Sequence, residues 1–414
     1  MLGRSSSPAG YAVRGLAAPR PGALAGRSRS LLARAFARNS PLRTMDWVLV
    51  AAAAGLSGIG IVLVWAATEP ALLAAGLSPR GYMEKQTAWV ALGLLLMGAV
   101  SLLDTRQIRA WAPLAYGVTL LGLLAVLSPL GAQVNGAHAW ISVPGGFQIE
   151  PSEFAKVALV LIVAYVISEA RSGLARPAGT PGVRSVLIAL ACAAPVLALV
   201  AVEPALGAAV VLAVTAGAMI VLSGVRLRVI AALAAAVAAV IFAAGGLHLL
   251  RSYQLSRLTS FLHPHSDLSG AGYQAAQAKI AVGSGGLFGT GLFHGQIVAG
   301  NYVPSQPTDF IFTVAGEELG FVGTIVIVFL LGVVIVRALR IAARAGDHFG
   351  MLLASGITVW FAFQSFVNIG MTIGITPITG IPLPFVSYGG SAIFGDMIAI
   401  GLLQSVHRRR RVFE

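Results

Sequence analysis

The feature that most constrains the fold is a series of apolar runs that recur along most of the chain, each about 20 residues long. That is the length a helix needs to cross the hydrocarbon core of a bilayer. Only helices and closed barrels satisfy their backbone hydrogen bonds in lipid. Because these runs lack the apolar–polar alternation of barrel strands, the sequence predicts an all-α integral membrane protein.

The composition agrees with a membrane protein and argues against other classes. Only 10% of the 414 residues are charged, whereas soluble domains carry about 25%. The single cysteine, Cys192, excludes a disulfide framework, and no Cys/His cluster has the spacing of a zinc site. The net charge of +13 is typical of arginine retained on one side of a bilayer, so we expect no nucleic-acid partner.

The first 44 residues differ from the rest of the chain. They contain eight arginines and no acids, and they are rich in Ser, Ala, Gly and Pro, which predicts a disordered basic tail. An organelle transit peptide has a similar composition, and Met45 is an alternative start because "MDWVLV" opens directly into an apolar run. We favour a dispensable cytoplasmic tail or a start-site artefact, followed by a membrane domain over 45–407 and a basic tail over 408–414.

About ten transmembrane helices are expected. The predicted spans are 46–68, 87–103, 110–130, 150–168, 185–203, 206–224, 228–249, 319–338, 351–374 and 385–406.

The basic residues set the expected orientation. With the N-terminus inside, the inner connections and the two tails hold 22 of the 28 Lys and Arg residues, as the positive-inside rule requires. Both termini are then cytoplasmic. The longest outer connection, 250–318, falls between spans 7 and 8, and loops beyond about 15 residues usually carry function.

One outer motif, "NGAHAWISVPGGFQIEPSEFAK" over 135–156, ends in a predicted helix start. Pro151 and Ser152 precede an apolar run, and Glu153 and Lys156 share one helix face. Ionisable residues in a span are unfavourable, and they usually face a cavity or one another. Two interpretations stay open: an ion pair that only fixes packing, or a polar spot that lines a substrate cavity.

The long outer connection contains one isolated acid, Asp267, in "FLHPHSDLSGAGYQ" over 261–274. Its neighbours in sequence are cationic or titratable: Arg251, Arg257, His263 and His265. A carboxylate near cations stays ionised and can accept a proton from a sugar hydroxyl, which is worth about 10²–10⁴ in rate. The alternative is that Asp267 caps the helix that begins near Gly270.

The segment 271–292, "AGYQAAQAKIAVGSGGLFGTGL", begins as an amphipathic helix and ends in glycines. We expect this helix at the membrane surface, with Gln274, Gln277 and Lys279 available to a head group. The glycines lack the GK[ST] ending of a phosphate-binding loop. They predict either a flexible hinge or backbone contact with phosphate.

Two further motifs lie at the outer ends of spans, "PTDFIFTVAGEELG" over 307–320 and "PLPFVSYGGSAIFGD" over 382–396. The first places three acids at the edge of the eighth span: Asp309, Glu317 and Glu318. The second places Ser387 and Tyr388 among small residues that allow close approach of helices or a ligand. Asp396 lies deeper and is expected to be hydrogen-bonded. Helix packing alone would explain much of this pattern.

Taken in order, these motifs resemble one family, the SEDS family (shape, elongation, division and sporulation). The matching strings are "NGAHAWI…FQIEPSEFAK", "FLHPHSDLSGAGYQAAQA", "GLFGTGL", "TDFIFTVAGEELGFVG" and "GIPLPFVSYGGS". The segment "NYVPSQPTDFIFTVAGEELG" is more similar to the RodA branch than to the FtsW branch. In this family the catalytic acid falls on Asp267, and the Glu and Lys of the fourth span fall on Glu153 and Lys156.

The resemblance implies a peptidoglycan glycosyltransferase in the bacterial cytoplasmic membrane. It would polymerise lipid II at the outer face during cell elongation, with Asp267 as general base on the GlcNAc 4-hydroxyl and undecaprenyl pyrophosphate as leaving group. The residues expected to bind substrate are Glu153, Lys156, Trp140, Arg257, Lys279, Gln274, Asp309, Ser387 and Tyr388. The expected partners are lipid II, the undecaprenyl-linked glycan and a class B penicillin-binding protein that acts as transpeptidase.

The leaving pyrophosphate needs positive charge from Arg, Lys or a divalent cation. Because the sequence shows no dedicated metal cage, we expect Mg²⁺ or Mn²⁺ to be bound partly through the substrate phosphates.

The chain departs from the family pattern in three places. His138 stands near Trp140 where the family often has Arg, Ala205 replaces an Asp in "EPALG", and His263 replaces the Asn before the proline of the catalytic motif. These changes leave Asp267 in place but affect the usual ligands of the glycan or pyrophosphate.

Other functions fit some of these features. A lipid II flippase or another carrier would suit the ion pair of the fourth span and the helices interrupted by Gly or Pro, although the two halves of the chain show no internal repeat. A division polymerase of the FtsW type, or a scaffold that mainly binds a partner enzyme, are further alternatives.

Overall fold

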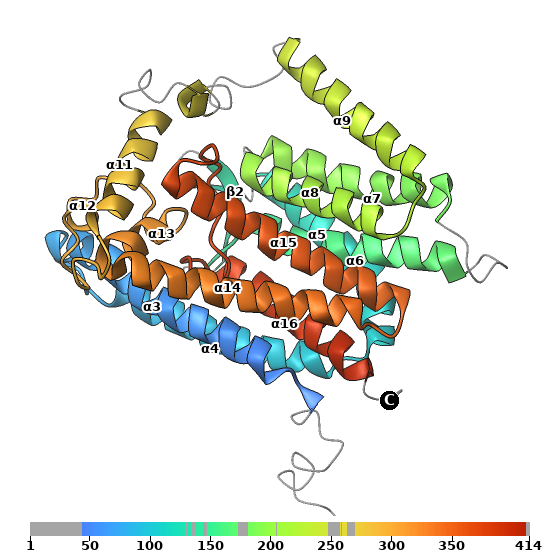
Figure 1. Cartoon of the computed structure of the whole chain (residues 1–414), viewed down its shortest axis with the longest axis horizontal. Coiled ribbons are helices and arrows are strands. Elements are labelled where there is room, and N and C mark those ends of the chain that lie inside the picture. The colour runs from blue at the N-terminus through green and yellow to red at the C-terminus, as the bar shows by residue number, and fades with distance from the viewer. Residues whose placement is uncertain are drawn as a thin grey trace, which may run out of the picture. The chain divides into compact units, whose positions relative to one another are not determined.

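Helices occupy all ten apolar runs in the computed structural model (Figure 1). The structure describes residues 44–129, 131–134, 137–143, 147–172, 181–203, 205–246, 257, 259–262 and 270–410. Within these ranges, the helices that coincide with the runs are α3 (Trp47–Ala74), α4 (Gly81–Leu102), α5 (Thr105–Val126), α6 (Pro151–Ser172), α7 (Val183–Val202), α8 (Leu206–Leu222), α9 (Leu227–Gly246), α14 (Gly320–Ala343), α15 (His348–Ile373) and α16 (Gly390–Arg410).

Six helical segments in the described part of the chain are long and apolar enough to cross a membrane. They are α3, α4, α5, α7, the continuous stretch Ile311–Ala343 and α15. Helices α8 and α9 are apolar but give shorter segments, and α6 and α16 carry buried polar residues such as Lys156 and Asp396. The helical membrane class is therefore confirmed, whereas the count of ten crossings and their orientation stay predictions.

Local capping explains where several helices begin. The Asp46 carboxylate accepts a hydrogen bond from the backbone N–H of Leu49 at the start of α3. Helix α5 begins five residues before the predicted bound because Asp104 and Gln107 form a capping box. Helix α16 begins five residues later than predicted, at Gly390, because residues 382–389 form a loop in which Phe385 has a φ of 66°.

A small β-sheet is the element that the all-α prediction lacked. Strands β1 (Gly131–Val134), β2 (Ala137–Val143) and β3 (Phe147–Ile149) pair antiparallel in the order β1-β2-β3. Ile141 of β2 lies opposite Gly131 on one side and Ile149 on the other. The sheet fills most of the connection between α5 and α6, and its last strand leads directly into the start of α6.

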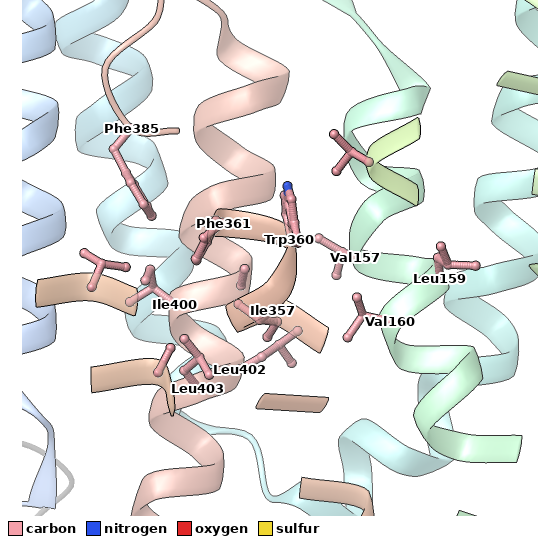
Figure 2. Close-up of a cluster of buried hydrophobic side chains, with 14 of the residues drawn as sticks. Val157, Leu159, Val160, Ile357, Trp360, Phe361, Phe385, Ile400, Leu402 and Leu403 are labelled. Atoms are coloured by element: carbon pink, nitrogen blue, oxygen red, sulfur yellow. The ribbon is translucent and has the colours of Figure 1, made fainter. Parts of the chain in front are cut away.

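Helix α15 is the main packing centre of the described bundle. It contacts α6, α8, α14 and α16, and α16 packs in turn along α4. Figure 2 shows part of the resulting core, with Val157 of α6 beside Trp360 of α15. The other labelled core residues in this view are Leu159, Val160, Ile357, Phe361, Phe385, Ile400, Leu402 and Leu403. Because lipid is as apolar as these side chains, close packing and polar contacts hold the helices together.

Polar contacts join distant helices at the end where α3 begins. Arg337 of α14 donates from Nε to Asp46 Oδ2 at 2.7 Å, and the Gln404 side chain exchanges two hydrogen bonds with the backbone of Asp46. At the start of α15, the Asp347 carboxylate pairs with Arg409 of α16 at 2.8 Å. These contacts fix the ends of α3, α14, α15 and α16 relative to one another.

The long connection between α9 and α14 is partly helical. Its described elements are α11 (Ala271–Ser284), α12 (Gln296–Ala299), α13 (Ile311–Val314) and the π-helix η1 (Ala315–Leu319). The helix predicted at the start of 271–292 is thus confirmed as α11, whereas its position at the membrane surface stays a prediction. It packs against α15, α13 and η1 and therefore contacts protein on one side.

The glycines that follow α11 serve close backbone packing. Thr290 N–H donates to the Glu317 carbonyl at 2.9 Å, and Phe321 N–H donates to the Gly286 carbonyl at 2.9 Å. A Cβ added to Gly289 would lie 2.1 Å from the Glu318 carbonyl oxygen. The glycine run is paired with η1 and the start of α14, which argues against a flexible hinge. Backbone contact with phosphate stays a prediction.

Candidate functional site

The candidate site forms where the start of α6, the segment before α13 and the loop 378–391 meet beside α15. Its central group is the ammonium of Lys156, which lies 2.7 Å from Glu153 Oε2. Both side chains are 3% exposed. Lys156 also donates to Gln364 Oε1 at 3.0 Å and lies 5.1 Å from the centre of the Trp360 ring. Glu153 and Lys156 thus form a buried ion pair, one of the two interpretations that the sequence left open.

Two amide side chains of α15 connect this ion pair to the loop. Gln364 accepts from Trp360 Nε1 at 2.7 Å and donates from Nε2 to the Pro382 carbonyl at 2.8 Å. One turn later, Asn368 Nδ2 donates to the carbonyls of Ile381 and Asp309, at 2.7 and 2.8 Å. These amides therefore hold the loop and the backbone of Asp309 in fixed positions next to Lys156.

Ser387 and its neighbours close the loop against the segment before α13. The Ser387 hydroxyl accepts from Leu383 N–H and donates to the Thr308 carbonyl, and the side chain is buried. Gln86 of α4 donates from Nε2 to the Ser387 carbonyl at 3.1 Å. As expected, Asp396 is hydrogen-bonded: its Oδ2 accepts from Phe385 N–H at 2.9 Å. The Ser387 hydroxyl is thus occupied by one contact within the loop and one to the segment before α13.

Tyr388 lies at the outer edge of this arrangement. Its backbone N–H donates to the Pro307 carbonyl at 2.8 Å, and its ring centre lies 4.8 Å from Tyr82 and 4.9 Å from Trp89. Burial, followed by the nearby Tyr82, raises the pKa of the Tyr388 phenol. Tyr388 is therefore a neutral group in an aromatic cluster at physiological pH.

Three acids outside the helices have raised pKa values: Asp309 and Glu150, which feel the charge of Glu153, and Glu203, which feels the charge of Glu150. Burial raises the pKa of Asp309 from 3.8 to about 6, although the Arg257 guanidinium opposes this. Burial, then the charge of Glu153, raises the pKa of Glu150. Burial, then Glu150, raises the pKa of Glu203 from 4.5 to about 8. Buried carboxyl groups lose the solvation that stabilises their charged form.

A cavity of about 380 Å³ is lined in part by Arg257, whose guanidinium also acts on Asp309. Its polar and charged lining comprises Arg257, Ser260, Lys279 and Thr376. Arg257 donates from NH1 to the Thr379 carbonyl at 3.2 Å, and the Lys279 side chain lies across Gly374, whose φ is 78°. The fold therefore brings two cations from separate segments to the wall of one cavity.

The predicted site residues fall into several groups. Glu153, Lys156 and Asp309 lie together, and Arg257 and Lys279 share the cavity. Trp140 is partly buried on β2 opposite Ala132, and Gln274 is partly buried on α11. Asp267, Arg251, His263 and the side chain of His138 lie outside the described residues.

Several residues that organise the site were not predicted from the sequence: Glu150, Glu203, Trp360, Gln364 and Asn368. A signal for two of them was present. Gln364 and Asn368 are the amides of an otherwise apolar run and stand four residues apart, which places them on one helix face. Polar residues on one face of a span indicate a polar interior.

The described residues do not form a metal cage of their own. Among them, no group of three or more His, Cys, Asp or Glu side chains converges as metal ligands do. How a divalent cation would be held stays a prediction, because Asp267, His263 and His265 lie outside the described residues.

Comparison with known proteins identifies the family. The model of the FtsW, RodA and SpoVE family, described as "Cell cycle protein", matches residues 46–412. The peptidoglycan glycosyltransferase MrdB of Escherichia coli (strain K12) is 39% identical over 332 residues, which cover 80% of this chain and 87% of that protein. The probable peptidoglycan glycosyltransferase FtsW of Trichlorobacter lovleyi is 38% identical over 372 residues, which cover 88% and 93%.

Solved structures agree with this assignment. A chain from a structure described as "Structural coordination of polymerization and crosslinking by a peptidoglycan synthase complex" superposes with a TM-score of 0.71 at 29% identity, covering 88% of this chain and 98% of that chain. The crystal structure of the rod shape determining protein RodA of Thermus thermophilus superposes with a TM-score of 0.63 at 28% identity, covering 88% and 97%. The chain is therefore a multi-pass membrane protein that belongs to the SEDS family of peptidoglycan glycosyltransferases.

Proposed function

We propose that this chain polymerises lipid II into glycan strands at the outer face of the cytoplasmic membrane. The observation that carries the proposal is the cavity walled by Arg257 and Lys279, two cations from separate segments, in a chain of this family. A lipid diphosphate that leaves in the reaction gains negative charge, and nearby cations stabilise that charge. Arg257 and Lys279 supply two such cations at the cavity wall.

In the proposed reaction, Asp267 accepts the proton of the GlcNAc 4-hydroxyl on the incoming lipid II. The freed oxygen forms a bond to C1 of the sugar at the end of the growing chain. The bond between C1 and the pyrophosphate oxygen breaks, and undecaprenyl pyrophosphate leaves with the electron pair. A positioned carboxylate is worth about 10²–10⁴ in rate for such a proton transfer.

The cations take different roles in this proposal. Arg257 and Lys279 stabilise the pyrophosphate as its negative charge grows. Lys156 is already paired with Glu153 and bonded to Gln364, so it stabilises the surrounding loop. Mg²⁺ or Mn²⁺, held largely by the pyrophosphate, would supply further positive charge when bound.

The other residues predicted to bind substrate have more limited roles in this proposal. Tyr388, Trp140 and Gln274 are partly buried and remain candidates for contact with the disaccharide. Because the Ser387 hydroxyl is occupied by Leu383 and Thr308, we assign Ser387 to holding the loop in shape.

For the biological role we propose cell elongation, with a class B penicillin-binding protein as transpeptidase partner. The similarity to MrdB and RodA supports elongation, although the FtsW relatives are nearly as similar. A partner is supported by the similar chain from a peptidoglycan synthase complex that couples polymerization and crosslinking.

The test is polymerisation of labelled lipid II by the purified protein with its partner, in Mg²⁺ or Mn²⁺, comparing wild type with Asp267→Asn. Glu84→Gln is the matched control, because Glu84 is an exposed acid at the start of α4. We expect glycan ladders from wild type and the control and none from Asp267→Asn. Ladders from all three would exclude Asp267 as the base. Transfer of lipid II across vesicles without any ladders would favour a carrier instead.

A further inference from the structure

The short segment 374–380 connects the end of α15 to the loop 381–389. Its first and last residues are glycines with positive φ, 78° at Gly374 and 69° at Gly380. Gly374 ends α15 in the left-handed conformation, and its backbone N–H donates to the Gly370 carbonyl. Since glycine is common at helix ends for backbone reasons alone, the side chains that cross these two glycines decide whether they have a further role.

The segment is held against α15 at both of its ends. The backbone N–H of Thr376 donates to the Gly370 carbonyl at 3.2 Å, and its hydroxyl donates to the Val367 carbonyl at 3.0 Å. At the other end, Asn368 donates from Nδ2 to the Ile381 carbonyl at 2.7 Å. Because both ends are bonded to the same helix, the segment has a fixed shape and can position groups that pack on it.

Lys279 of α11 passes directly across Gly374. A Cβ added to Gly374 would lie 1.9 Å from Cε and 2.4 Å from Nζ of Lys279, so any other residue would displace the lysine side chain. The preceding residue, Ala278, is buried in a small apolar cluster that includes Ile378 of the segment. The backbone of Lys279 is therefore fixed beside the segment, while its side chain is exposed and lines the cavity.

Gly380 lies against the other cation of the cavity, Arg257. A Cβ added to Gly380 would lie 3.7 Å from Arg257 NH1 and 3.4 Å from Asp309 Oδ2, which is ordinary contact distance. A side chain longer than alanine would therefore crowd the guanidinium. The residue before this glycine, Thr379, accepts a hydrogen bond from Arg257 NH1 through its carbonyl at 3.2 Å. The segment thus contacts both cations, one at each glycine.

We propose that the segment 374–380 positions the two cations of the cavity for the diphosphate group of the lipid substrate. Gly374 leaves the path open for Lys279, and Gly380 leaves room for Arg257, so both glycines are positioning residues that act through a cation. Cations held on a fixed segment lose less side-chain freedom when the anion binds, which favours binding. This inference rests on the proposed function, and it concerns binding of the substrate before any chemical step.

The experiment measures the Kd of fluorescently labelled lipid II for the full-length protein in detergent micelles, in an Asp267→Asn background that prevents consumption of the substrate. The variants are Gly374→Asn and Gly380→Asn, because asparagine tolerates positive φ better than most residues. Gly224→Asn is the matched control, since Gly224 has a φ of 82° and a Cβ there meets nothing within 4 Å. We expect the Kd to rise at least about tenfold in the two variants, the value of one hydrogen bond to a charged group, and to stay unchanged in the control.

A double-mutant cycle separates the positioning of Lys279 from a general loss of structure. Lys279→Ala alone should weaken binding about tenfold, and adding Gly374→Asn should bring no further loss, because the side chain that it displaces is already gone. Losses that multiply in the double variant would overturn the role of Gly374. The same cycle with Arg257→Ala tests Gly380. If size-exclusion chromatography shows that Gly374→Asn does not fold, Gly374→Ala replaces it, because its one added carbon already meets Lys279.

The outcomes distinguish this inference from the proposed function. Unchanged binding in Gly374→Asn and Gly380→Asn, with tight binding by the parent, would overturn the inference alone. A parent protein that does not bind lipid II would overturn the proposed function and the inference with it. Binding with the expected losses, but without glycan ladders when Asp267 is intact, would overturn the proposed polymerisation and support the positions of the cations.

Discussion

Lys156 shows how a single residue couples packing to charge in this site. Its ammonium has partners on two helices, Glu153 on α6 and Gln364 on α15, and the Trp360 ring covers it. Removing two charges from water is unfavourable, and only close pairing and further hydrogen bonds offset this. Both are present here, so the loss of one partner leaves the other as an isolated buried charge.

Lys156→Met should therefore destabilise the protein by about 3–5 kcal/mol, because it leaves the Glu153 carboxylate buried without a cation. The double variant Lys156→Met/Glu153→Gln should recover most of that loss but polymerise lipid II at least about tenfold more slowly than wild type. Thermal unfolding in detergent and glycan ladders measure the two effects separately. If the double variant folds and polymerises like wild type, the pair serves packing only.

Glu203 gives the folded protein a definite pH dependence. Its pKa rises from 4.5 to about 8 on folding, so between these values the folded protein keeps a proton that the unfolded chain releases. The contribution of this proton to the free energy of unfolding is therefore present at low pH and is lost as the pH rises through about 8. Melting temperatures in detergent between pH 5 and pH 9 should fall for wild type and fall less for Glu203→Gln. A wild-type slope in Glu203→Gln would show that Glu203 ionises without penalty.

At the scale of elements, the features that could be predicted from the sequence are those that depend on neighbouring residues. The apolar runs became helices, and Pro151 and Ser152 marked the start of α6, because both signals are local. The loop 381–389 was not predictable, since its shape depends on Gln86, Gln364 and Asn368 from other helices. The sheet was missed because the connection between α5 and α6 is rich in glycine and its alternating stretches, such as "FQIE" over 147–150, are very short.

The pairing of the glycine run with η1 makes a prediction about single glycines. Gly289 has a φ of 82°, and a Cβ there would meet the Glu318 carbonyl at 2.1 Å. Gly289→Ala should lower the free energy of unfolding by about 2–4 kcal/mol, because the new side chain strains the backbone and displaces it. Gly283→Ala is the matched control: a Cβ at this position in α11 meets nothing within 4 Å, so it should be neutral or stabilise by up to about 1 kcal/mol.

The measurement is the folded fraction of each variant after heating, followed by size-exclusion chromatography in detergent. Equal losses for the two variants would mean that the glycine run is not held against η1 as the structure places it.

At the scale of the whole molecule, charge and connectivity point to one orientation. Arg226 and Arg228 lie at the connection between α8 and α9, and Arg337, Arg340 and Arg344 lie at or near the connection between α14 and α15. The sheet and the loop 374–389 carry no Lys or Arg, and the much longer segment 247–310 carries three. In the proposed reaction the lipid II sugar lies outside the membrane. The sheet, the long connection and the loop 374–389 must then lie on the outer face. The distribution of arginine and the position of the site therefore favour the same orientation independently.

Cysteine labelling tests this orientation directly, because Cys192 is the single cysteine of the chain and Cys192→Ser gives a cysteine-free background. Ser78→Cys lies in the exposed turn between α3 and α4, and Gly346→Cys lies in the turn between α14 and α15, where a side chain meets nothing within 4 Å. A membrane-impermeant maleimide applied to spheroplasts should label Ser78→Cys, and Gly346→Cys should react only after the membrane is opened. The opposite pattern would place Arg257, Lys279 and Lys156 at the cytoplasmic face, where the proposed polymerisation of outward-facing lipid II has no substrate.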